Sequence, residues 1–216
     1  MDTQQILYKI LMIPAILVAF TFHEYAHAIT ADKLGDKTPR FQGRLTLNPI
    51  AHIDPMGFIL ILLMGFGWAK PVQTNPSAYK NYYKDDLLVS AAGPIANLIL
   101  GFVFAILTVA FAKFSPIQGT LASIIYTILA ITGSINCMLF FLNLVPIPGF
   151  DGFHILRDLF PKYVSELSDS IYRYQFLIFM VLILPILPGG ESVFTYLVQV
   201  PASWLFTQFS NIAGMF

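Results

Sequence analysis

The chain has 216 residues, of which 56% are hydrophobic and only 11% are charged, so its composition excludes an ordinary soluble domain and indicates a polytopic membrane protein. Twelve basic residues balance twelve acidic ones without a basic tract, which argues against a nucleic-acid partner and leaves lipids and membrane-embedded chains as partners. Cys137 is the only cysteine, which excludes an intrachain disulfide and a cysteine-based zinc site.

The first half of the chain contains one long apolar run and one short one. Residues 6–30 are long enough, at about 1.5 Å per residue, to cross a hydrocarbon core of about 30 Å, and we predict a helix kinked at Pro14. Residues 31–55 are polar and rich in turn formers, which predicts a loop. Residues 56–68 are too few for a full crossing, so we expect a re-entrant or interfacial piece, and residues 68–72 could form an edge strand.

Two further crossings are predicted at residues 87–111 and 123–145. The first of these has a small-residue stripe at intervals of four, which allows close helix packing in lipid; the stripe consists of Gly93, Asn97, Gly101 and Ala105. The second ends in a run with two prolines and two glycines, which turns the chain sharply beside Asp151.

The last part of the chain is less clearly patterned. Residues 174–187 predict a fourth crossing that is shorter than ideal, and residues 192–216 predict either an interfacial helix or another spanning piece. The expected fold is therefore an all-α polytopic membrane protein. It has about four to five transmembrane helices, with a re-entrant or short β-like element between the first and second. We expect one domain over residues 1–216, with a core at residues 6–152 and C-terminal helices at residues 153–216.

The first predicted helix carries the sequence His23-Glu24-Tyr25-Ala26-His27. An HExxH on a helix places two imidazoles one turn apart on one face, with the glutamate beside them as a potential base. Ionisable groups in a membrane-length segment are costly, so such a cluster indicates a functional site. A polar cluster without catalytic function is the weaker alternative.

A catalytic zinc site needs three protein ligands and an open position. His23 and His27 supply two, and among the few acids at a suitable depth Asp151 is held in a rigid turn beside a crossing, so we expect it to be the third. Glu24 would take a proton from the attacking water and return it to the leaving amine.

Other polar residues are weaker candidates. Asn143 or Asn97 could donate to a developing oxyanion, although a hydrogen bond between helices explains either residue equally well. His52 and His154 have no partner histidine three or four residues away, so we expect both to be interfacial or loop histidines and not metal ligands.

The positions of lysine and arginine predict the orientation. Ten of the twelve fall between residues 31 and 86 or after the third crossing, whereas Lys9 and Lys113 fall on the other side. The positive-inside rule makes the side of the ten cytoplasmic. His23 then lies about 10 Å inside the cytoplasmic end of its helix, and Asp151 is on the same side. We expect the active site to lie inside the membrane, near the cytosol.

Two motifs carry a family resemblance: the HExxH of residues 23–27, and Asn143-Leu-Val-Pro-Ile-Pro-Gly-Phe-Asp151-Gly152 at the end of a later helix. Together they resemble the signature of the site-2 protease family of intramembrane zinc metalloproteases, in a compact form without a PDZ domain. Further matches to the family lie at residues 43–55, 67–72 and 92–97. Phe150 stands where the family more often has leucine, and it keeps an apolar residue beside Asp151.

The resemblance implies one Zn²⁺ per chain on His23, His27 and Asp151, with Glu24 as the base. It also implies proteolysis within the bilayer of membrane-anchored substrates, by a multi-pass protein of the cell membrane. The compact size and the lack of targeting sequences suggest a prokaryotic source. With no PDZ domain, the edge strand at residues 68–72 is expected to hold an unwound substrate, so Val72→Pro should impair cleavage.

Two other functions remain possible from the sequence. A catalytically silent relative could bind membrane segments as a scaffold, but His23, Glu24, His27 and Asp151 are all intact. A small transporter would also carry intramembrane ionisable groups, but it would spread them along the bilayer depth, and here they gather at one end.

Overall fold

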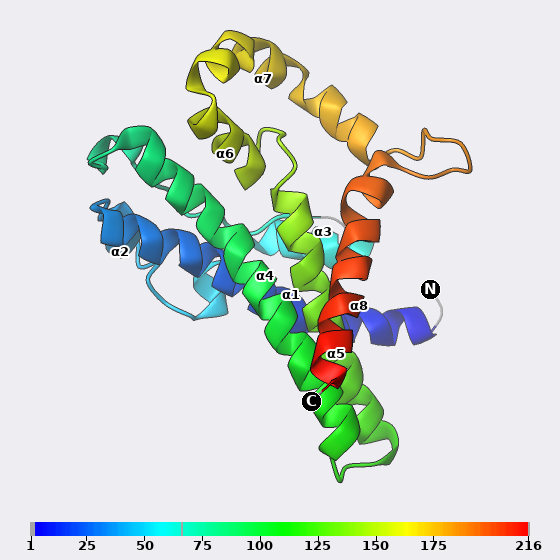
Figure 1. Ribbon diagram of the computed structural model, residues 1–216. Helices are drawn as coiled ribbons and strands as arrows, with labels where there is room; N and C mark the ends of the chain where they lie inside the picture. Colours follow the sequence, from blue (N-terminus) through cyan, green and yellow to red (C-terminus); the bar gives the residue numbers. More distant parts are fainter. Residues whose placement is uncertain (1–2, 66, 216) are drawn as a thin grey trace.

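The computed structural model describes residues 3–65 and 67–215, and in these residues the chain is built from helices (Figure 1). In chain order the elements are α1 (Thr3–Leu34), α2 (Thr38–Phe41), η1 (Pro49–Ala51), α3 (Pro55–Met64), η2 (Pro76–Ala78), α4 (Tyr82–Phe114), α5 (Gly119–Asn143), α6 (Asp151–Leu159), α7 (Pro161–Ile183), η3 (Thr195–Gln199) and α8 (Val200–Gly214). The prediction of an all-α polytopic membrane protein is confirmed.

Three of the described helices, α1, α4 and α5, are long and apolar enough to cross a membrane. They pack against one another, and the predicted small-residue stripe lies in their interface, because Gly93, Asn97, Gly101 and Ala105 are all buried. A Cβ added at Gly101 would lie 2.7 Å from Sγ of Cys137, so glycine is what lets α4 approach α5 there.

The short apolar piece forms α3, a helix of 10 residues that is too short to span the bilayer. Asp54 caps its start by accepting the N–H of Gly57 at 2.8 Å, and Gly65, with φ 81°, ends it in the left-handed conformation. Lys9 Nζ donates to the carbonyl of Leu63 at 2.9 Å, so α3 ends beside the first turns of α1. A re-entrant helix fits these contacts.

The predicted edge strand is reduced to an isolated bridge. Ile53 pairs with Ala69 in antiparallel sense, the N–H of Lys70 donates to the carbonyl of His52 at 2.9 Å, and the described residues contain no longer strand. The segment is nevertheless fixed in place, because a Cβ on Gly57 would overlap the backbone of Trp68. The first turn of α3 therefore supports residues 67–72.

The predicted fourth crossing at residues 174–187 is not found, because α7 lies across one end of the bundle (Figure 1). At its midpoint, Tyr172 contacts Phe153 of α6 with ring centroids 5.3 Å apart. At its end, Leu182 packs with Val145 and Ile147, which follow α5. The middle and the last turn of α7 are thus held at the end of the bundle that carries Asn143, and α7 is not among the described helices that are long and apolar enough to cross a membrane.

The C-terminal helix instead runs along the bundle. Phe209 of α8 stacks edge-on against Phe102 of α4 at 5.1 Å, and a Cβ on Gly133 of α5 would overlap the ring of Phe206. Lys113 Nζ donates to the carbonyl of Gly214 at 2.6 Å, which places the end of α8 beside the end of α4. Of the two alternatives for residues 192–216, these contacts favour the spanning piece.

Candidate active site

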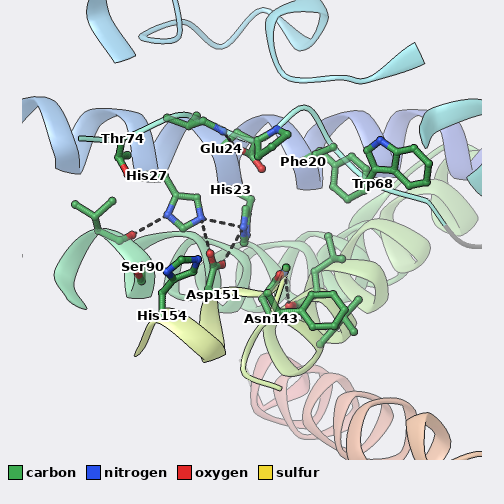
Figure 2. Close-up of a pocket in the computed structure, with 18 of the residues that line it drawn as sticks. Phe20, His23, Glu24, His27, Trp68, Thr74, Ser90, Asn143, Asp151 and His154 are labelled. Carbon is green, nitrogen blue, oxygen red and sulfur yellow. Dashed lines mark hydrogen bonds and ion pairs between the residues drawn. The ribbon is translucent and has the colours of Figure 1, made fainter. Parts of the chain in front are cut away.

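His23, His27 and Asp151 converge on one point in the core of the bundle (Figure 2). The two Nε2 atoms lie 3.0 Å apart, Nε2 of His23 lies 3.2 Å from Oδ2 of Asp151, and Nε2 of His27 lies 3.3 Å from Oδ1. The histidines come from α1 and the carboxylate from the first turn of α6. Residues more than 120 positions apart in the sequence thus meet as the sequence predicted.

Hydrogen bonds on the far side of each imidazole fix its tautomer. Nδ1 of His23 lies 2.6 Å from Oδ1 of Asn97, whose Nδ2 donates to the carbonyl of Ala19 at 3.2 Å and to Asn136 at 2.8 Å. Nδ1 of His27 lies 2.7 Å from the carbonyl of Val89. Because both partners are acceptors, each Nδ1 carries the proton and each Nε2 presents a lone pair.

The helix α4 touches both imidazoles at Gly93. A Cβ built there would lie 2.6 Å from Cε1 and 2.7 Å from Nε2 of His23, and it would also overlap His27. Distances of this kind are far below van der Waals contact, so only glycine fits at this position. Gly93 thereby allows Asn97, one turn further along α4, to reach His23.

Asp151 is held by a turn and by an ion-pair cluster. The turn includes Gly149, with φ 101°, and Gly152, where a Cβ would lie 2.5 Å from the carbonyl carbon of Leu144. Further along α6, Arg157 pairs with Asp86 of α4 and, at 2.8 Å, with Asp158. Burial and the nearby Asp86 charge raise the pKa of Asp158 to about 6, although Arg157 opposes the shift. The cluster ties α6 to α4.

Glu24 lies beside the ligands and is also buried. Its Oε2 accepts the N–H of Val72 at 2.7 Å, and Nη2 of Arg44 lies 3.7 Å from the same oxygen. The side chain lines the cavity that contains His23, His27 and Asp151. A carboxylate in this position can accept a proton from water that enters the cavity.

A cavity of about 720 Å³ opens onto these groups (Figure 2). One set of lining side chains is apolar and comprises Phe20, Trp68, Leu139 and Leu142. Another set is polar and comprises Thr74, Ser90, Asp86, Asn143, His154 and Arg157. The cavity therefore offers both apolar and polar surface to a bound chain.

Comparison with known proteins assigns the family. The model of Peptidase family M50 matches residues 11–124 and 109–187. The chain belongs to this family. M50 peptidases are the site-2 proteases, which use zinc, so the chain is a zinc metalloprotease. The family resemblance seen in the sequence is confirmed.

Relatives of this M50 peptidase have matching names. The chain is 41% identical over 183 residues to "Putative zinc metalloprotease YwhC" of Bacillus subtilis, which covers 84% of this chain and 83% of that protein. It is 32% identical over 213 residues to "Putative zinc metalloprotease Rip2" of Mycolicibacterium smegmatis, and the alignment covers 95% of this chain and 76% of that protein. It is 31% identical over 157 residues to "Putative zinc metalloprotease MJ0611" of Methanocaldococcus jannaschii, and the alignment covers 70% of this chain and 72% of that protein. No solved structure matches.

The donor set of this M50 peptidase suits zinc. Ligand atoms at about 2.0–2.1 Å from a tetrahedral ion are about 3.3 Å from one another, and the spacings here are 3.0, 3.2 and 3.3 Å. Oδ2 of Asp151 is buried and accepts no hydrogen bond from the described residues. Two imidazole Nε2 atoms and a carboxylate that face one another at these spacings form a donor set that a divalent cation would bind.

The structure distinguishes the two asparagines that were candidates for an oxyanion donor. Asn97 is 0% exposed, does not line the cavity, and directs its polar atoms to His23, Ala19 and Asn136. The oxyanion expectation for Asn97 is therefore wrong, and the residue orients His23. Asn143 lines the cavity, and its Nδ2 donates one hydrogen bond, to the carbonyl of Leu139 at 3.0 Å. Its second amide hydrogen is free to point into the cavity.

Sequence reasoning undervalued three residues around the site. His154 lies one turn after Asp151 and lines the cavity, and burial lowers the pKa of its imidazole. His52 is fully buried, its Nε2 lies 2.7 Å from the carbonyl of Thr46, and burial lowers its pKa. Arg44 contributes to the cytoplasmic charge bias and lies in the family match at residues 43–55, and neither observation assigns it a role in the site. The motif matches at residues 43–55 and 92–97 were the available signals for Arg44 and Gly93.

Proposed function

We propose that the chain is an intramembrane endopeptidase that hydrolyses peptide bonds in or near the transmembrane segments of membrane-anchored proteins. The observation that carries the proposal is the convergence of potential metal-ligand atoms of His23, His27 and Asp151, which lie within a bundle of membrane-length helices. An acceptor cluster of this kind is costly in a bilayer unless it binds a cation. A polar cluster without function would not leave all of its lone pairs facing one another.

We assign the metal to His23, His27 and Asp151, one Zn²⁺ per chain. Zinc bound there supplies a Lewis acid that polarises the scissile carbonyl and lowers the pKa of water. Asn97 and Val89 hold the Nδ1 protons, so each imidazole keeps its Nε2 lone pair for the metal.

Glu24 is the proposed general base. Val72 and Arg44 occupy the surroundings of Oε2, which leaves Oε1 to accept a proton from the attacking water and pass it to the leaving amine. Asn143 can donate its free amide hydrogen to the oxyanion that forms on the carbonyl oxygen, a role that typically contributes about 2.7 to 4 kcal/mol.

A substrate must unwind before cleavage, because a helical peptide bond is shielded by its own hydrogen bonds. The hydrogen bonds at residues 69–72 use the N–H groups of Lys70 and Val72 and the carbonyl of Lys70, and they leave both backbone groups of Ala69 for another strand. We propose that an extended substrate pairs with Ala69 and passes the acceptor cluster.

The orientation is also a proposal. The charge bias favours a cytoplasmic location for the end of the bundle that carries α6, with Lys9 and Lys113 on the opposite side. The active site would then lie on the cytoplasmic side of a cell membrane, and the prokaryotic organisms of the relatives favour a prokaryotic source.

Two variants test the assignment of roles. Glu24→Gln should keep about one zinc per chain and lose cleavage, because an amide cannot accept the proton, whereas Asp151→Ala should lose both. The measurements are zinc content and cleavage, in proteoliposomes, of a set of single-pass reporters with one transmembrane segment between two fluorescent domains. Full activity in either variant contradicts the mechanism. A wild-type chain that binds zinc and reporters but cleaves none would instead support a scaffold.

A further inference from the structure

Arg44 is a buried cation that the proposed mechanism does not yet use. It follows Gly43, whose φ of 68° turns the chain after α2, and the residue is only 4% exposed. Its guanidinium donates to the carbonyl of Ala51 at 2.5 Å and to the carbonyl of Lys70. Its Nε is buried without an acceptor among the described residues.

Among the described residues, the only carboxylate that forms an ion pair with this guanidinium is that of Glu24, with Nη2 and Oε2 3.7 Å apart. A buried charge is tolerated when an opposite charge and hydrogen-bond partners surround it. The two carbonyls supply the hydrogen bonds to Arg44, and Glu24 supplies the charge. Arg44 therefore sits where its charge acts mainly on the proposed base.

The contacts of Arg44 and Glu24 close a ring. Oε2 of Glu24 accepts the N–H of Val72, Lys70 lies two residues before Val72, and the carbonyl of Lys70 accepts from Arg44. The ring fixes one carboxylate oxygen from two directions, by an amide and by a cation. The other oxygen of Glu24 is left for the cavity.

We propose that Arg44 is a positioning residue for the catalytic base: it holds Oε2 of Glu24 against the Val72 amide, so that Oε1 faces the reacting water. This inference rests on the proposed function, because it assigns Glu24 as the base. It extends that function by joining the base and the segment of residues 67–72 into one unit.

A purely structural role for Arg44, as a clamp on residues 67–72, makes a different prediction. Two contacts hold this segment without Arg44, namely the bond from Lys70 N–H to the His52 carbonyl and the close packing of Trp68 on Gly57. Loss of Arg44 should therefore disturb Glu24 more than it disturbs the binding of substrate to the segment.

The test compares Arg44→Met, Arg44→Lys and the control Arg40→Met, using the reporter that the wild-type chain cleaves. Arg40 is a matched cation on α2 that pairs with Asp32 at 2.8 Å and does not line the cavity. Zinc per chain, kcat, KM and amide hydrogen exchange of residues 67–74 are measured for each.

We expect Arg44→Met to keep its zinc and to lower kcat about 10²-fold with a change in KM of less than about threefold, since a small misplacement of a catalytic group acts on the chemical step. Arg44→Lys should recover at least about a tenth of the wild-type kcat, because an ammonium keeps the charge near Glu24. Arg40→Met should match the wild type.

Several results would overturn the inference. They are an unchanged kcat in Arg44→Met, a rise in KM alone, faster exchange over residues 67–74 with loss of zinc, or no recovery with lysine. An active wild type with an unaffected Arg44→Met contradicts only the role of Arg44. A wild type that binds zinc and cleaves no reporter contradicts the proposed function, and the role of Arg44 falls with it.

Discussion

Single residues around the metal ligands decide whether the three ligand atoms meet. His23 and His27 are one helical turn apart, so their sequence spacing alone predicts that they face the same side. The tautomer of each ring depends on Asn97 and Val89, which come from a different helix. No local sequence pattern indicates such partners, which is why the sequence left Asn97 open between an oxyanion donor and a hydrogen bond between helices, and the structure shows the latter.

At the same scale, Gly93→Ala tests the close approach of α4 to the imidazoles. The added methyl would overlap His23 and His27, so we expect this variant to bind at least about tenfold less zinc, the size of effect seen when the support of a metal ligand is altered. Gly214→Ala is the control, because a Cβ there meets nothing within 4 Å. Zinc titration measures the affinity of each variant. A wild-type zinc affinity in Gly93→Ala would show that α4 can move away from the imidazoles without weakening the metal site.

The helices could be predicted from the sequence where the apolar run that forms them is long. The helices α1, α4 and α5 follow from apolar runs, and the small-residue stripe predicted which face of α4 is buried. The end of the chain was misjudged, because α7 has both a polar start and an apolar end. Packing of Leu182 against Val145 and Ile147, which no sequence window contains, keeps α7 on one side of the bundle.

The segment at residues 67–72 also carries two roles that the sequence merged into one. The backbone groups of Ala69 form no hydrogen bond with the described residues and are proposed to pair with a substrate strand, whereas the Val72 N–H donates to Glu24. We therefore expect Ala69→Pro to raise KM by about tenfold and Val72→Pro to lower kcat, since proline removes a different N–H in each case. Steady-state kinetics on the cleaved reporter distinguish an effect on KM from an effect on kcat. Equal effects on KM in both variants would contradict the assignment of substrate binding to Ala69 and of base positioning to Val72.

The molecule as a whole has an orientation that follows from its charges and its contacts. Lys9 and Lys113 mark one side, and the contact of Lys113 with Gly214 places the end of α8 there too. The native cysteine is buried, so introduced cysteines report alone. In intact cells, a membrane-impermeant thiol reagent should label Lys113→Cys, and it should label Lys162→Cys only after lysis. The opposite pattern would place the active site near the outer face.

The central claim is that His23, His27 and Asp151 hold one zinc ion, and X-ray absorption at the zinc edge tests it most directly. The purified chain should show about one zinc with a shell of nitrogen and oxygen only, at about 2.0–2.2 Å. Asp151→Asn should alter that shell, and His23→Ala should lose the bound metal. A sulfur ligand, or a zinc shell that neither substitution changes, would contradict the account.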